Sequence, residues 1–92
     1  MSLTNESSFT ILSNPLAVRL QTEVLQSAWE RVLLNIEQSR TESAILEQVS
    51  TARGFAWGLR VAELVDEVGY TTMGAEITLA QQAALHRAGS RQ

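Results

Sequence analysis

The 92-residue sequence contains no cysteine, and this absence excludes disulfides, thiol catalysis and cysteine-ligated zinc. It contains one histidine, His86, so a metal site built from several histidines is excluded as well. Lysine is also absent: 7 arginines stand against 10 acidic residues, and the formal net charge is −3. A broad phosphate-binding surface usually shows as a basic excess, so nucleic acid is not an expected partner. The composition therefore predicts a protein without a metal or a cofactor.

Long hydrophobic runs are missing too. No apolar stretch approaches the roughly 18 residues of a membrane-spanning helix, and residues 1–6 lack the basic and apolar regions of a signal peptide. The hydrophobic share of 45% is nevertheless ordinary for a folded chain. We therefore expect one small folded domain with no membrane contact.

Proline occurs once, at Pro15, where it follows Asn14 in a pattern typical of a helix start. Neither glycine nor proline then occurs until Gly54. Apolar residues recur at steps of 7, 4, 3 and 4, at Val18, Leu25, Trp29, Val32 and Ile36. This spacing predicts a helix over residues 15–38. Residues 1–14 are polar except for a patch at Phe9, Ile11 and Leu12, and they are interpreted either as an arm or as a frayed terminus.

The seven polar residues 37–43 interrupt the apolar stripe and predict a turn, although one continuous helix is the alternative. Ser39 and Glu42 fit a capping box. A second helix is expected over residues 41–68 with Gly69 at its end, then a loop over residues 69–77 and a short helix over residues 78–88. The fold class is therefore predicted as all-α: an antiparallel two-helix hairpin (15–68), an extended N-terminal arm (1–14), and a loop with a short third helix (69–92).

The predicted hairpin matches large side chains with small ones across its two helices. If the chain folds back near residue 40, Trp29 faces Ala52 and Leu25 faces Ala56, as close packing requires. Two glycines inside the second helix each cost about 1 kcal/mol relative to alanine. Close helix approach would offset this cost, and the alternatives are neutral drift or a helix break at Gly54. The predicted helix-packing residues are Leu25, Trp29, Ala52, Gly54, Ala56 and Gly58.

The second predicted helix carries apolar residues on two sides, and a two-helix hairpin cannot cover both. The outward set is expected to form an interface with the apolar part of the arm. Its members are Phe9, Ile11, Leu12, Trp57, Val61, Leu64 and Val65. The expected partner is another copy of the chain, in a homo-oligomer, or a larger protein assembly.

Residue types that support catalysis are few and poorly placed. His86 is interpreted as a residue at a helix end, where a cation suits the helix dipole. Glu63, Asp66 and Glu67 cluster in sequence, and Glu63 and Glu67 share a helix face. No Glu-x-x-His accompanies them, so a solvated acidic face is expected instead of a metal site. The sequence predicts a non-enzymatic protein.

A DNA-binding alternative comes from residues 61–72, which read as the helix and turn of a helix-turn-helix with Gly69 in the turn. With residues 78–91 as the second helix, this region resembles the turn region of arabinose-operon-type regulators. That second helix offers only Arg87 and Arg91 as basic residues. The alternative function is therefore a small helix-turn-helix DNA-binding or regulatory protein.

A family resemblance rests on Trp29 in the first predicted helix and on residues 52–60 in the second, Ala-Arg-Gly-Phe-Ala-Trp-Gly-Leu-Arg. Over residues 14–68 the chain resembles small helical-hairpin structural or accessory proteins of tailed bacteriophages. The resemblance implies a virion or assembly component, located in a phage particle or in the cytoplasm of a bacterial host. It implies no binding residues.

Overall fold

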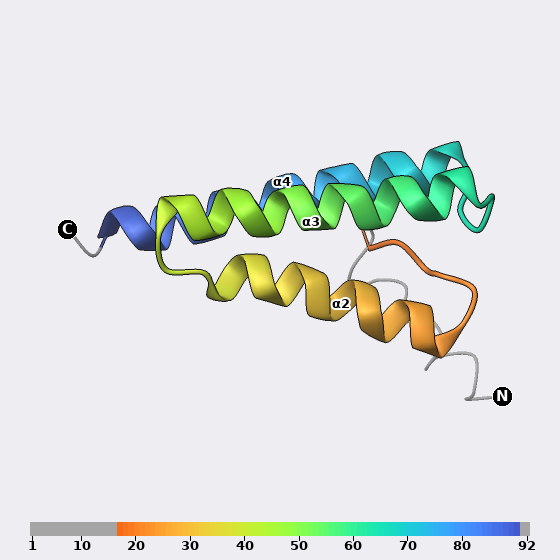
Figure 1. Ribbon diagram of the computed structural model, residues 1–92, viewed down its shortest axis with the longest axis horizontal. Coiled ribbons are helices and arrows are strands. Elements are labelled where there is room, and N and C mark those ends of the chain that lie inside the picture. The colour runs from red at the N-terminus through yellow and green to blue at the C-terminus, as the bar shows by residue number, and fades with distance from the viewer. Residues whose placement is uncertain (1–16, 91–92) are drawn as a thin grey trace, which may run out of the picture.

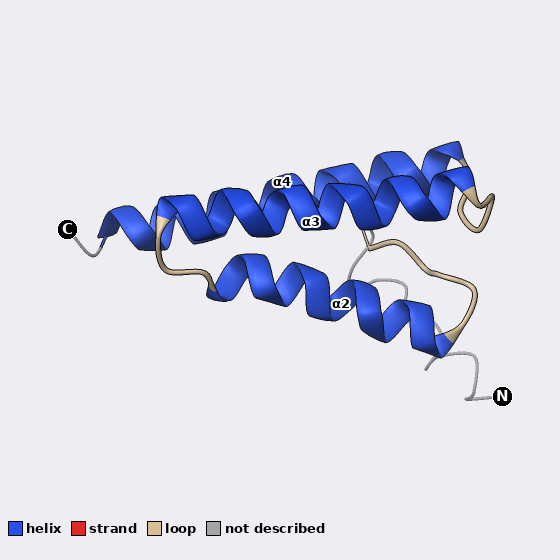
Figure 2. Cartoon of the chain, viewed as in Figure 1, coloured by secondary structure: helices blue, strands red, loops and turns tan. Residues whose placement is uncertain are grey.

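The computed structural model describes residues 17–90 and contains three helices in that range: α2 (Glu23–Gln38), α3 (Glu42–Val61) and α4 (Glu67–Ser90). The α2 and α3 helices run in opposite directions, and α4 returns along α3 (Figure 1). No strand occurs in this part of the chain (Figure 2). The predicted all-α class is confirmed. The third helix, however, has 24 residues and packs against both others, so the expectation of a short one was wrong.

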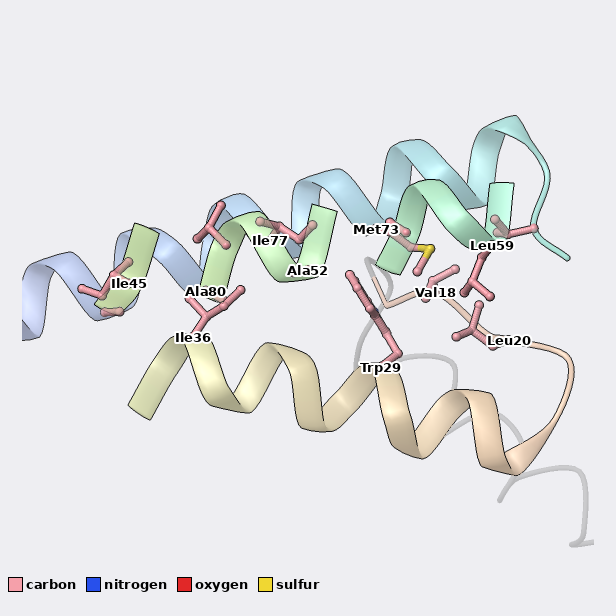
Figure 3. Packing of buried hydrophobic residues seen from close by; sticks show 14 residues of the cluster. Val18, Leu20, Trp29, Ile36, Ile45, Ala52, Leu59, Met73, Ile77 and Ala80 are labelled. Carbon is pink, nitrogen blue, oxygen red and sulfur yellow. The ribbon is translucent and has the colours of Figure 1, made fainter. Parts of the chain in front are cut away.

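One apolar core lies between the three helices (Figure 3). The α3 helix contributes a long buried stripe, with steps of 4, 3, 4 and 3. The buried residues are Val18, Leu20, Trp29, Ile36, Ile45, Val49, Ala52, Ala56, Leu59, Val65, Met73, Ile77, Ala80 and Ala84. No polar or charged residue is buried in the described range.

The first helix begins later than predicted. The α2 helix starts at Glu23, and the Thr22 hydroxyl caps it by accepting a hydrogen bond from the Leu25 amide at 3.1 Å. Residues 17–20 are not helical, and the alternating residues Val18 and Leu20 are buried. Alternate burial is the pattern of an extended chain, so the predicted helix start at residue 15 was wrong. Residues 1–16, with Phe9, Ile11, Leu12 and Pro15, lie outside the described range.

The turn between α2 and α3 lies where the polar stretch predicted it. The capping residue differs, because Thr41 caps α3 through a 3.1 Å bond from the Ala44 amide to its hydroxyl. Ser39 instead terminates α2: its amide donates to the Ile36 carbonyl and its hydroxyl donates to the Asn35 carbonyl. The expected Ser39–Glu42 capping box was therefore wrong, because the N-cap of α3 is two residues further along the chain.

The α3 helix ends at Val61, seven residues before the predicted end. The Leu64 amide donates to the Leu59 carbonyl at 2.9 Å, and the Glu63 amide donates to the Arg60 carbonyl at 3.0 Å. These two bonds form a Schellman motif, in which the left-handed position usually holds glycine. Here Glu63 occupies that position with φ 62°. The usual glycine signal is absent, and this is why the helix end was missed.

The α4 helix begins at Glu67, inside the predicted second helix, and continues through residues 69–77, which were predicted as a loop. The Asp66 carboxylate accepts a hydrogen bond from the Gly69 amide at 2.8 Å, as a helix N-cap does. A Cβ at Gly69 would collide with the Val65 side chain, so glycine here permits a close approach and does not end a helix. The connection between α3 and α4 lies before Glu67, and Gly69 is part of the first helical turn of α4. The prediction that Gly69 lies in the turn of a helix-turn-helix was therefore wrong.

Replacing Glu63 with glycine should stabilise the fold by about 0.5–1 kcal/mol. The left-handed conformation costs a residue with a Cβ about 1–2 kcal/mol, while glycine loses only about 0.5–1 kcal/mol in extra chain entropy. Urea unfolding followed by circular dichroism would show a higher midpoint. The matched control is Glu47→Gly in the middle of α3, which should lower stability by about 1 kcal/mol. A lower midpoint for Glu63→Gly would contradict the assignment of the motif.

Candidate interaction surface

The outer side of α3 near its C-terminus exposes large apolar side chains. Trp57 is 57% exposed and Val61 is 61% exposed, and Leu64 follows in the turn after the helix. We call these three residues the α3 surface. Exposed tryptophan is characteristic of protein–protein contact sites, where large aromatic side chains supply much of the binding energy. The sequence analysis placed these three residues in an interface, and the structure shows that the bundle leaves them exposed.

Trp57 is held in place by a neighbour from α4. Its ring lies 6.1 Å from the Tyr70 ring, centroid to centroid, at an interplanar angle of 60°. Tilted aromatic pairs at this distance are favourable beyond the area that they bury. The contact fixes one side of the indole and leaves the other side free. Tyr70 was missed in the sequence because residues 69–77 were read as a loop.

The other predicted interface residues are placed differently. Val65 is buried in the core beside Gly69 and is not available to a partner, so its assignment to an interface was wrong. It follows the Schellman turn, which redirects the chain inward. The remaining members, Phe9, Ile11 and Leu12, lie outside the described residues.

The predicted packing residues divide into two groups. Trp29, Ala52 and Ala56 are buried in the core, with Leu25 partly buried against them. Trp29 also stacks on Phe55, with ring centroids 5.7 Å apart. Gly54 and Gly58 are exposed, and a Cβ added to either would meet no atom within 4 Å. The expectation that these glycines allow close helix approach was therefore wrong within the bundle.

A polar junction that the sequence analysis did not find connects residues 17–20 with α2 and α4. Glu76 on α4 accepts a hydrogen bond from the Trp29 indole nitrogen at 3.0 Å, and one from the Val18 amide at 3.4 Å. Gln26 completes the junction: its side-chain oxygen accepts from the Leu20 amide at 2.8 Å, and its side-chain nitrogen donates to the Val18 carbonyl. The junction ties residues 17–20 to two helices.

Burial raises the pKa of the Glu76 carboxyl above its ordinary value. Desolvation is the largest cause, and the nearby charge of Glu30 adds to it. The hydrogen bonds from Trp29 and Val18 act in the opposite direction, because they favour the ionised carboxylate. Since these bonds tie Glu76 to the core, we assign it a structural role.

Two hollows lined partly by charged side chains lie on the surface of the described residues. A hollow of about 470 Å³ is lined by Arg19, Arg60, Glu63 and Asp66 among others, and one of about 440 Å³ lies beside Arg40 and Arg87. Within residues 17–90, no group of three or more His, Asp or Glu side chains is placed to hold a metal ion. The described helices also include none with the length and apolar character needed to cross a membrane.

Comparison of the chain with protein-family models, with curated proteins and with solved structures finds no match.

Proposed function

We propose that this protein is a non-enzymatic assembly component that docks on a larger protein complex through the α3 surface. The observation that supports the proposal is the 57% exposure of Trp57, in a bundle that buries its other tryptophan completely. Exposing an indole to water is unfavourable, and burying it against a partner recovers the hydrophobic free energy. Val61 and Leu64 extend the apolar area on either side of the turn.

Two arginines lie near the α3 surface, and the exposed Glu63 lies in the chain between Val61 and Leu64. Arg53 and Arg60 lie four residues before and three residues after Trp57 on the same helix. Arginine and tryptophan are enriched at protein interfaces, while lysine and acidic residues are depleted there. Arginine can also form planar contacts and bidentate hydrogen bonds with a carboxylate. We propose that Arg53 and Arg60, two of the seven arginines, contact the partner in this way.

The setting that we propose for this assembly role is a bacteriophage particle or its assembly in the host cytoplasm. It is suggested by the resemblance over residues 14–68 to small helical-hairpin proteins of tailed phages.

The docking role predicts that Trp57→Ala weakens association without unfolding the protein. A central interface tryptophan contributes at least about 2 kcal/mol to binding, which corresponds to about a 30-fold loss of affinity. The cost to the fold is about 1 kcal/mol, because the Tyr70 ring contact is the main interaction lost. In a density gradient of lysate from the producing cell, the wild-type chain should migrate with a large particle, and Trp57→Ala should shift it to the light fractions.

The matched control is Val24→Ala, since Val24 is an exposed apolar residue on a different helix, α2. It should migrate with the wild type. A thermal melt of each purified variant establishes that the fold is retained. Wild-type protein that stays entirely in the light fractions, or Trp57→Ala that stays with the particle, would contradict the proposed role.

A further inference from the structure

The α4 helix lacks charge over most of its length. From Val68 to Leu85 its only charged residue is Glu76, which is partly buried and hydrogen-bonded to Trp29 and Val18. The outer sides of the other helices carry charges, such as Glu30 and Arg31 on α2 and Glu47 on α3. A helix face that meets water normally carries charged residues. The outer face of α4 has the composition of a covered surface.

The hydroxyls of two threonines on this helix are hydrogen-bonded within the helix. The Thr72 hydroxyl donates to the Val68 carbonyl at 3.0 Å, and the Thr78 hydroxyl donates to the Gly74 carbonyl at 3.1 Å. Because these hydroxyls are already bonded within the helix, covering them leaves no donor without an acceptor. These two hydroxyls therefore add little polar cost when the face is buried.

The outer residues of α4 follow the spacing of a helix-pairing stripe. Val68, Thr72, Ala75, Leu79 and Gln82 recur at steps of 4, 3, 4 and 3. Val68 is 75% exposed and Leu79 is 51% exposed, and nothing in the described bundle covers them. The buried stripe of the same helix consists of Met73, Ile77, Ala80 and Ala84. The α4 helix thus has one apolar stripe in the core and a second, uncharged one outside.

The outer stripe is complementary to itself when two copies run antiparallel. If the twofold axis passes near residue 77, Leu79 of each copy faces Ala75 of the other, and Thr72 faces Gln82. Each leucine then meets the small side chain that close packing requires. A face without charge also meets an identical face without like-charge repulsion, which favours a second copy over a charged partner.

We infer that the protein forms a symmetric homodimer in which the outer faces of two α4 helices pack antiparallel about residue 77. The contact is isologous, as in most soluble dimers. The dimer contact uses a different helix from the α3 surface. The α3 surface therefore stays exposed in the dimer and can still dock on a larger complex. The inference goes beyond the proposed docking role and can hold even if that role fails.

Native mass tests the inference on the purified full-length chain. At tens of micromolar the wild type should sediment with twice the 10.1 kDa mass of one chain. Leu79→Glu should sediment as a monomer with unchanged helicity, because the new charge is solvated in the monomer and would be buried against Ala75 of the other copy in the dimer. The matched control Leu46→Glu changes an exposed leucine on α3 and should remain dimeric.

Disulfide cross-linking tests whether the two α4 helices run antiparallel. Because the chain contains no cysteine, each variant carries only the cysteine that is introduced. When Thr72→Cys and Gln82→Cys proteins are mixed and oxidised, an antiparallel dimer brings one cysteine of each kind within bonding distance. In either variant alone, the two identical cysteines would lie about 15 Å apart along the axis, ten residues at 1.5 Å each. Disulfide dimers should therefore form efficiently only in the mixture.

Three outcomes would overturn the inference: a monomeric wild type, a Leu79→Glu variant that remains dimeric, or cross-linking that is as efficient within each variant as in the mixture. None of these bears on the gradient behaviour of Trp57→Ala. Failure of the dimer and failure of the docking role are therefore separate results.

Discussion

Replacing Trp29 with alanine is expected to lower the free energy of unfolding by about 3–5 kcal/mol. The side chain is fully buried and lies where α2 meets both other helices. The substitution removes the stacking contact with Phe55 and the hydrogen bond to Glu76, and leaves a cavity in the centre of the core. A domain of this size has a total stability of about 5–14 kcal/mol, so the variant should lose a large part of it.

Circular dichroism melts and urea titrations measure this loss, which should appear as a drop in melting temperature of about 4–8 °C for each kcal/mol. Trp29→Phe separates the two contributions, because it retains most of the ring packing and removes the indole N–H. It should fall between the wild type and Trp29→Ala. The matched control Val24→Ala, at an exposed position of the same helix, should change stability by less than about 0.5 kcal/mol. An equal effect of Trp29→Ala and Val24→Ala would contradict the assigned core.

Two substitutions at Glu76 are expected to act in opposite directions. Glu76→Ala removes the acceptor of the buried Trp29 indole N–H and should cost about 1–3 kcal/mol. Glu76→Gln keeps a side-chain oxygen that can accept from both Trp29 and Val18, and it removes a partly desolvated charge close to Glu30. At pH 7 the glutamine variant should therefore be more stable than the wild type. Equal destabilisation by both would show that the carboxylate charge itself is required.

The pH dependence provides a second measurement on Glu76. Its pKa is higher in the folded protein than in the unfolded chain, so the folded state binds more protons in the interval between the two values. The contribution of Glu76 to stability is thus fully present below the unfolded pKa, about 4.3, and is lost as the pH rises through the folded pKa. The advantage of Glu76→Gln should shrink as the pH falls through that interval.

The sequence predicted the features that depend on local pattern. The polar stretch over residues 37–43 located the α2–α3 turn, because a helix cannot bury a face that has no apolar residues. The spacing of Ile45, Val49, Ala52, Ala56 and Leu59 predicted the buried face of α3. Exposure of Trp57 and Val61 followed from the same pattern, since a helix buries one stripe and leaves the opposite side to solvent or to a partner.

The third helix was misread because two glycines were given more weight than a weak periodicity. Gly69 and Gly74 suggested a loop, while Met73, Ile77, Ala80 and Ala84 recur at steps of 4, 3 and 4 through the same segment. Alanine and methionine give a weaker hydrophobic signal than leucine or isoleucine, although they are equally buried here. The signal that could have identified α4 was this stripe together with Asp66 as the capping residue.

By itself, then, the sequence determined an all-helical chain, the position of its first turn, the core face of α3 and the exposed apolar residues of that helix. Only the tertiary structure decided that residues 17–20 are extended, that α3 ends at a glutamate in a left-handed conformation, and that Glu76 points inward. The first and third of these depend on contacts between residues far apart in the chain: Val18 with Glu76, and Trp29 with Glu76. The second depends on the Schellman hydrogen bonds that place Glu63 at the left-handed position. Local propensity favours a helix by less than about 1 kcal/mol per residue. Burial of a single large apolar side chain contributes about 1.5–3 kcal/mol, so packing overrides local preference wherever the two disagree.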